Sequence, residues 1–421
     1  MSENKTIEIL KLRSVTIAGY DVETSFVEIT IYESLSLPMI SGNITIRDYQ
    51  GLQEIGNIFA GDDLEIAVYV DNDEANEVIL KLKIISNEGS RQLSLNTYDI
   101  LRLEFASPWW VEAVGRTISK PYKDKFIHEI VEDLLTKECS AEIGIIEPTK
   151  HKLESFVTPW WTPYHSIKYF KQFALSEQDQ GGYVLWTDFK TGKVNFTTLD
   201  YLLRGNLGKY KSFLVYTDNN RYSGRVIGMN IEQNYDLIRM LNNGMGNSRF
   251  YIFNYDKKKI YKTENDVTKT KLSRLGSKFP LDKKYMEPKY INHNYSSFFP
   301  KTKAPLTDDD KIKEIADGIE KTNYAYMTVD TIKINIETLG EMKRRVGWIA
   351  ELKYPSAGAN AGETGDKTGH KQYAGWYLIR EIRHEIDMKK DYTQIVTLVG
   401  DGFKEFDLPE MIDWDKADVR V

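Results

Sequence analysis

The stretch that most constrains the fold is residues 37–70, in which two alternating segments flank a connection that is rich in glycine. The hydrophobic or small set on one face of these segments is Ile40, Gly42, Ile44, Ile46, Leu64, Ile66, Val68 and Val70. Because successive side chains of a strand point to opposite faces, this period-two pattern marks two strands with one buried face each. Gly61, at the entry of the second strand, tolerates the backbone angles of a barrel corner. We therefore expect a small, strongly curved β-structure here.

The same alternation runs through the whole N-terminal quarter of the chain. It predicts strands at 7–17, 26–33, 40–48, 63–70, 78–86 and 97–106. Five or six strands of this length can close into a small barrel or sandwich. We expect residues 1–107 to form a first β-barrel domain.

The pattern changes at Pro108. Hydrophobic residues at helical spacing predict helices over 122–137 and 164–177, and a β-hairpin follows with strands at 183–186 and 194–198. We interpret residues 108–215 as a mixed α+β domain, with 240–306 packing on it and 255–305 read as surface loop.

A second β pattern follows. Residues 329–354 repeat the rhythm of 43–70: an alternating strand, a connection with glycines, and a glycine at the entry of the next strand. Thr307, which is followed by three aspartates, predicts the start of a helix that comes before this segment in the chain. We expect 216–239 and 307–402 to form a second barrel, leaving 403–421 as a C-terminal tail.

Composition excludes several classes of protein. The chain has 421 residues and a net charge of −6, which argues against a protein whose main function is to bind nucleic acid. Its polar start has no signal-peptide core, and no apolar run reaches the roughly 18 residues that a membrane span needs. A single cysteine, Cys139, excludes an intrachain disulfide. We expect folding in a cytoplasm and no membrane insertion.

Three segments together resemble the central baseplate hub protein of contractile-tailed bacteriophages, a family shared with contractile injection systems. They are the 40–70 unit, the block at 159–198 that begins with Pro-Trp-Trp, and the closing strand pair at 375–403. In the last segment the matching positions are Tyr377, Ile379, Ile382, His384 and Ile386. The resemblance implies a mainly β fold with an α+β insertion: two tail-tube-like β-barrel domains in one chain, plus a mixed α/β domain.

The resemblance also implies a function in assembly. Such a hub is a homotrimer whose six barrels form a pseudo-sixfold ring that joins the central spike to the tail tube or its initiator. Surrounding wedge proteins of the baseplate are further partners, and DNA passes through the channel without specific binding. The protein would be a virion component, assembled in the host cytoplasm. Because acidic side chains repel phosphate, our candidates for lumen or ring-interface positions are Asp63, Glu65, Glu337 and Glu381.

Enzymatic alternatives have less support in the residues. The six histidines show no metal-ligand spacing, and consecutive strand residues such as His384 and Glu385 face opposite ways. We expect no catalytic site, no metal and no cofactor. The pairs Trp109–Trp110 and Trp160–Trp161 are interpreted as packing anchors at a domain boundary, with sugar stacking as the other reading. The alternatives that remain are a tail-associated cell-wall hydrolase and a glycan-binding tail protein.

Overall fold

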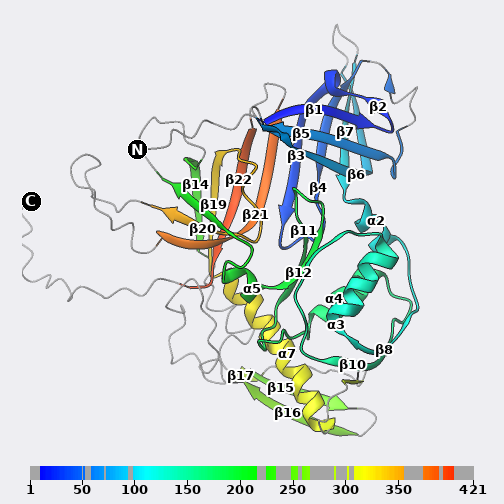
Figure 1. Ribbon diagram of the computed structural model, residues 1–421, viewed down its shortest axis with the longest axis vertical. Coiled ribbons are helices and arrows are strands. Elements are labelled where there is room, and N and C mark those ends of the chain that lie inside the picture. The colour runs from blue at the N-terminus through cyan, green and yellow to red at the C-terminus, as the bar shows by residue number, and fades with distance from the viewer. Residues whose placement is uncertain are drawn as a thin grey trace, which may run out of the picture.

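The computed structural model describes residues 10–49, 51–52, 58–70, 73–92, 98–215, 224–233, 248–254, 258–265, 289–290, 301–302, 308–354, 373–387 and 392–402. Thirteen strands form one sheet that runs through two β units, and a mixed α/β part packs below them (Figure 1). The predicted tail, 403–421, and Thr307 lie outside the described residues. Among those described, no helix is long and apolar enough to cross a membrane.

The first β unit follows the sequence pattern closely. Its elements are β1 (Leu10–Ile17), β2 (Tyr20–Asp21), the short helix η1 (Glu23–Ser25), β3 (Phe26–Ser34), β4 (Ser41–Asp48), β5 (Asp63–Val70), β6 (Asp73–Gln92) and β7 (Tyr98–Ala106). The strands pair in the order β3-β4-β7-β6-β5-β1. The inward residues of 37–70 fill the core of this unit, where Ile44, Ile46 and Leu64 are fully buried.

The second β unit has the same strand order as the first. Its strands are β13 (Lys209–Leu214), β14 (Val226–Gln233), β19 (Ile332–Leu339), β20 (Ile349–Lys353), β21 (Gly375–Asp387) and β22 (Tyr392–Gly400). They pair in the order β14-β19-β22-β21-β20-β13. Position by position, these strands are the counterparts of β3, β4, β7, β6, β5 and β1 of the first unit. One pairing differs in direction, because β13 runs parallel to β20 whereas β1 runs antiparallel to β5.

The correspondence extends to the positions where the register shifts. The β3–β4 ladder shifts between Phe26 and Glu28, and the β14–β19 ladder shifts at the counterpart positions Val226 and Gly228. Likewise the shift in β6 at Ile84/Ser86 has its counterpart in β21 at Ile379/Glu381. The repeat predicted from 43–70 and 329–354 is therefore present as a repeat of strand order, although the two segments share few identical residues.

The two units are joined edge to edge, and this joint determines whether the sheet of each unit can close into a barrel. Beyond its pairing with β20, strand β21 pairs with β3 of the first unit, from Asp387 opposite Glu28 to Glu381 opposite Ser34. Because β3 is engaged there, it does not pair with β1, and the first unit stays open at that point. The second unit closes only through a single bridge between Leu214 and Arg225. Among the described residues the predicted barrels are thus curled parts of one sheet.

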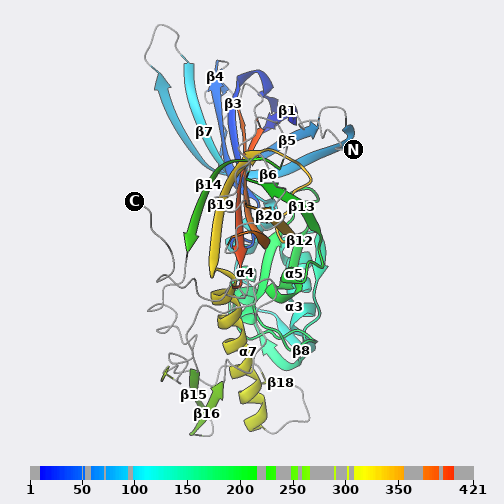
Figure 2. The same cartoon turned by 90° about the vertical axis from the view of Figure 1, so that its left-hand side faces the viewer.

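The mixed part lies between the β units in sequence and below them in space (Figures 1 and 2). Its elements are α2 (Pro108–Gly115), β8 (Pro121–Phe126), α3 (Ile127–Asp133), η2 (Leu134–Glu138), β9 (Ile143–Ile146), β10 (Lys152–Val157), α4 (Pro163–Lys171), β11 (Tyr183–Thr187), β12 (Val194–Thr198) and α5 (Leu199–Leu203). Later in the chain come β15 (Ser248–Asn254), β16 (Lys259–Asn265), β17 (Lys289–Tyr290), β18 (Lys301–Thr302) and α7 (Asp308–Val329).

Several sequence-based boundaries need correction. Residues 121–126 form strand β8, so the helix predicted from 122 begins only at Ile127, where the Glu129 carboxylate accepts a hydrogen bond from the Phe126 N–H at 3.0 Å. The stretch read as loop, 255–305, contains β16, which pairs with β15. The range predicted for the mixed domain, 108–215, includes strand β13, which pairs with β20 of the second β unit. Long-range pairing overrides local pattern in each strand.

Candidate functional site

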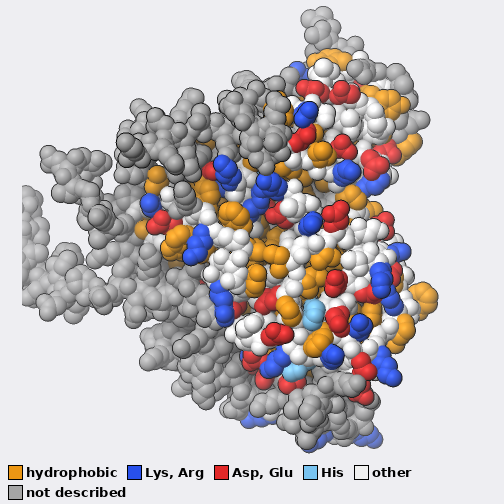
Figure 3. All heavy atoms as spheres, in the orientation of Figure 1, with side chains coloured by type: hydrophobic (Ala, Val, Ile, Leu, Met, Phe, Trp, Pro, Cys, Tyr) orange, Lys and Arg blue, Asp and Glu red, His pale blue; other side chains and the backbone are white. Residues whose placement is uncertain are grey.

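Two of the predicted lumen residues, Asp63 and Glu65, lie on the solvent face of β5. The Asp63 carboxylate is 2.9 Å from the Lys83 ammonium, and Glu65 lies directly opposite Lys81 on β6. Each acid therefore has a basic neighbour across the ladder, and this face is locally balanced in charge. Figure 3 shows the same interspersion of acidic and basic side chains on one face of the described part.

The other two, Glu337 and Glu381, lie on the outer face of the second unit. Glu337 is exposed on β19, opposite Gly228 and Ile395. Glu381 is half-buried on β21, opposite Ser34 of the first unit, and its carboxylate is 3.7 Å from the Arg380 Nε. The fold does not gather the four acids into one cluster, since two lie on β5, one on β19 and one on β21. Their assignment to a lumen stays a prediction.

The tryptophans divide into packed and exposed positions. Trp109 is buried, and its indole N–H donates to the Thr187 hydroxyl at 3.2 Å. Trp110 packs edge-on against Tyr164 with 4.5 Å between ring centroids, and Trp161 is half-buried. Trp160 differs from the prediction of a packing anchor: it is 72% exposed, and its backbone has a φ of 55°.

Sequence reasoning missed a buried polar cluster where the two β units and the mixed part meet. We call it the junction cluster. Its members are Glu33 of β3, Tyr210 of β13, Glu341 and Arg344 of the β19–β20 connection, His384 of β21, and Tyr392 and Gln394 of β22. A signal was present: Glu33 and Gln394 occupy inward positions of alternating strands, where hydrophobic residues are the rule.

Arg344 is the centre of the junction cluster and has no solvent exposure. Its guanidinium donates to the Leu339 carbonyl at 2.7 Å, to the Gln394 side-chain oxygen at 2.5 Å and to the Tyr210 hydroxyl at 3.2 Å. Its counter-charge is Glu341, at 3.4 Å, which also accepts from the Tyr210 hydroxyl at 2.5 Å. Burying a charge is tolerated only with such pairing. The cluster therefore fixes β13, β22 and the β19–β20 connection against one another.

The tip of the β11–β12 hairpin inserts into the same junction. The Phe189 N–H donates to the Glu33 carboxylate at 3.1 Å, and the Phe189 ring stacks on His384 with 4.3 Å between centroids. Asp188 lies 3.8 Å from the Arg345 guanidinium. One hairpin of the mixed part thus contacts β3 of the first unit and β21 of the second, so all three parts are locked at one place.

His384 is expected to make stability depend on pH. Burial lowers the pKa of His384, while the nearby Glu33 carboxylate raises it and Arg345 and Arg344 lower it further. A histidine whose folded pKa lies below its unfolded value of about 6.5 stabilises the fold fully above that pH. As the pH falls below about 6.5, the unfolded chain binds more protons, and we expect the free energy of unfolding to drop.

The measurement is urea unfolding of the wild type and of His384→Gln between pH 7.5 and 5. One histidine can change the free energy of unfolding by at most about 1.4 kcal/mol per pH unit. The variant should lose less stability on acidification, although His151 and His128, whose pKa values burial also lowers, keep some dependence in both proteins. Equal slopes in the two proteins would show that His384 does not titrate on unfolding.

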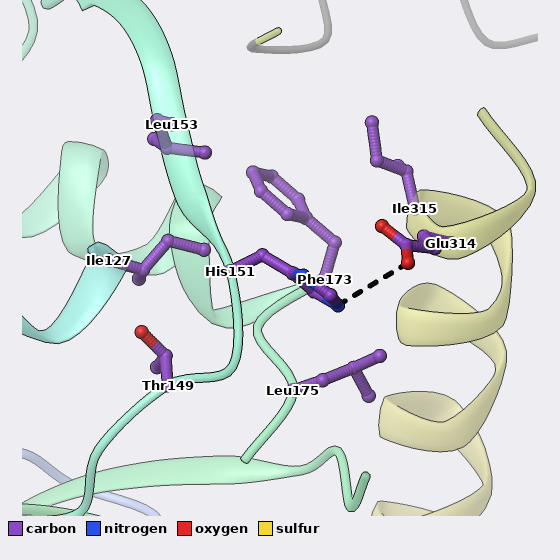
Figure 4. Close-up of a pocket in the computed structure, with 8 residues that line it drawn as sticks. All are labelled: Ile127, Thr149, His151, Leu153, Phe173, Leu175, Glu314 and Ile315. Atoms are coloured by element: carbon purple, nitrogen blue, oxygen red, sulfur yellow. Dashed lines mark ion pairs between the residues drawn. The ribbon is translucent and has the colours of Figure 1, made fainter. Parts of the chain in front are cut away.

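A small cavity in the described part of the chain lies between α7 and neighbouring segments of the mixed part, and Figure 4 shows it. It is lined by Ile127, Thr149, His151, Leu153, Phe173, Leu175, Glu314 and Ile315. Its space is about 20 Å³, which holds about one water molecule. His151 Nε2 faces the Glu314 carboxylate at 3.5 Å. The cavity is too small for a substrate, and we interpret it as part of the contact that docks α7.

Features of catalytic chemistry are sparse in the part of the chain that the structure describes. There, no three His, Cys, Asp or Glu side chains are grouped to hold a metal ion. Cys139 is buried, and burial raises the pKa of its thiol to about 12, which keeps it protonated at neutral pH.

Comparison with solved structures places this architecture among known folds. The tail protein of Neisseria meningitidis MC58 superposes with a TM-score of 0.58 over 94% of this chain and 97% of its own, at 12% identity. The 43 kDa tail protein of prophage MuSo2 from Shewanella oneidensis gives 0.55 over 94% and 100%, at 10% identity. The chain has the fold of phage tail proteins. The mainly β fold with a mixed α/β part, which the sequence resemblance implies, is confirmed, although the sequence matches no family profile and no curated protein.

Proposed function

We propose that the protein is the hub subunit at the centre of a contractile tail, where three copies form a pseudo-sixfold ring. One observation carries this: the chain contains two β units with the same strand order and two matching register shifts, joined edge to edge. A chain that holds two equivalent units presents six of them as a trimer, which matches threefold symmetry on one side to sixfold symmetry on the other.

The partners proposed for this ring follow from that symmetry. The spike binds on the threefold side and the tail tube or its initiator on the sixfold side, with wedge proteins around the ring. Genomic DNA passes through the channel without specific contacts, and the protein is located in the baseplate of the virion or of a phage-derived injection machine. The balanced charge beside Asp63 and Glu65 supports a face that does not bind DNA, since phosphate binding relies on a surplus of basic side chains.

The proposal predicts the assembled mass. Light scattering of the purified chain should give three times the 48.7 kDa of one copy, and negative-stain images of the same peak should show a ring with a central hole and a sixfold outline. If the ring needs the spike to close, adding the spike chain of the same tail should convert monomers to trimers. A chain that stays monomeric at every concentration, with or without the spike, would refute the proposal.

A glycan-binding tail protein is the second candidate, and Trp160 favours it. An indole that is 72% exposed offers a face on which a sugar ring could stack. Binding of peptidoglycan fragments that Trp160→Ala abolishes would support this function over the hub. We also propose that the chain is not an enzyme, so cell-wall clearing by the pure protein in a zymogram would contradict us.

A further inference from the structure

Two strand edges in the described part of the chain are left without a partner. Strand β14 pairs with β19 on one side. On its other side the described residues show one isolated bridge, between Leu214 and Arg225, the residue before β14. The β5 side of β6 is paired up to Lys83, and Ile84 still exchanges hydrogen bonds with the backbone of residues 61 and 62. From residue 85 to Gln92, no described strand lies on that side. Such edges are templates for strand addition.

The structural repeat identifies what each edge matches. Strand β14 is the counterpart of β3, and β6 is the counterpart of β21. Within the chain these counterparts pair with each other, because β3 and β21 form the antiparallel ladder that joins the two units. The free edge of β14 therefore corresponds to the edge of β3 that β21 covers, and the free edge of β6 corresponds to the edge of β21 that β3 covers.

Burial points to the same missing strand. Ile29 and Ile31 of β3 are 1% and 0% exposed beneath the joined sheet. Their counterparts in β14, Met229 and Ile231, are only half-buried, although both strands pack on the core of their own unit. An additional strand beside β14 would complete the burial of this pair, as β21 does for β3.

We propose that β14 of one copy pairs antiparallel with residues 85–92 of β6 in the next copy, repeating the β3–β21 ladder. The inference rests on the proposed hub ring and names the two edges that form it. In Figure 1 the two strands lie on opposite sides of the joined β units, β14 on the left and β6 on the right, so each edge serves a different neighbour. This heterologous contact closes into a ring when its rotation allows.

The internal ladder also sets the register. Tyr32 lies opposite Arg383, and its counterpart pair is Glu232 opposite Glu88 of the neighbouring copy. Like charges directly opposite each other on neighbouring strands are unfavourable. Each glutamate has a basic neighbour in its own copy, since Glu232 lies 3.3 Å from the Lys333 ammonium and Glu88 lies opposite Arg102. The row across the contact is balanced overall.

Disulfide trapping tests the pairing. Opposite residues of an antiparallel pair have Cβ atoms about 4.5–5.5 Å apart, close enough for a disulfide after small adjustments. We expect an oxidised mixture of Glu232→Cys chains with Glu88→Cys chains to give covalent dimers on denaturing gels, and the double variant to give covalent trimers. Cys139 is buried and does not compete.

Matched variants control for geometry. Tyr32→Cys with Arg383→Cys should close a disulfide within one chain, because these residues are opposite each other in the ladder. Glu232→Cys mixed with Glu104→Cys should give no dimer, since Glu104 is on β7, one strand further away. Dimers from this second mixture would overturn the proposed register.

The outcomes separate this inference from the hub proposal. Trimers by light scattering with no Glu232–Glu88 cross-link, while the intrachain control closes, would overturn the edge pairing and leave the hub function standing. Chains that remain monomeric with the spike present would overturn both. Covalent trimers from the Glu232→Cys/Glu88→Cys double variant, with no cross-link between Glu232→Cys and Glu104→Cys chains, would establish the β14–β6 contact.

Discussion

Replacing Arg344 with alanine should lower the free energy of unfolding by about 3–5 kcal/mol, the range seen when one partner of a buried ion pair is removed. Arg344 is completely buried, and its loss leaves Glu341, which is 4% exposed, without a counter-charge. It also removes the donor to the Gln394 side chain. Urea unfolding at pH 7.5 measures the effect.

An exposed arginine provides the control. Arg13 is 55% exposed and pairs with Glu77 at 3.3 Å, so Arg13→Ala should cost at most about 1 kcal/mol. The double variant Arg344→Met with Glu341→Leu removes both charges and should recover part of the loss, since hydrophobic replacements of buried pairs are often neutral. A loss from Arg344→Ala no larger than that of Arg13→Ala would mean that the junction cluster does not hold the units together.

Gly42→Ala should destabilise the protein by about 3 kcal/mol, the upper end of overpacking effects. Gly42 lies in β4 between β3 and β7. A Cβ added there would stand 2.0 Å from the Thr30 carbonyl oxygen and 2.7 Å from Cζ of Phe105, a fully buried ring. Neither the backbone of a central strand nor a packed ring can move away without disturbing the sheet. Thermal unfolding would show a lower midpoint.

Gly115→Ala is the matched control. A Cβ at Gly115, the last residue of α2, meets nothing within 4 Å, and alanine favours helix over glycine by up to about 1 kcal/mol. We therefore expect an unchanged or slightly higher midpoint. If Gly42→Ala unfolded at the wild-type midpoint, the close approach of Phe105 to β4 would be disproved.

Local alternation determined much of this fold. Strand β5 occupies the predicted range 63–70, and β3, β4 and β7 lie within one residue of theirs, because each strand has one buried face. The hairpin of β11 and β12 was predicted for the same reason. The repeat of 43–70 in 329–354 was also visible in the sequence, since both segments must build equivalent strands.

The tertiary structure decided what those strands do together. Periodicity cannot tell whether β3 pairs with β1 or with β21, because both partners satisfy the same buried face, and the choice turned two expected barrels into one joined sheet. Arg344 and Phe189 lie in connections without a period, so their meeting with Glu33 and His384 follows only from how three parts dock. The sequence by itself determined the strands and their repetition. Docking alone determined the junction cluster and the unpaired edges of β14 and β6, because these depend on contacts between residues far apart in the chain.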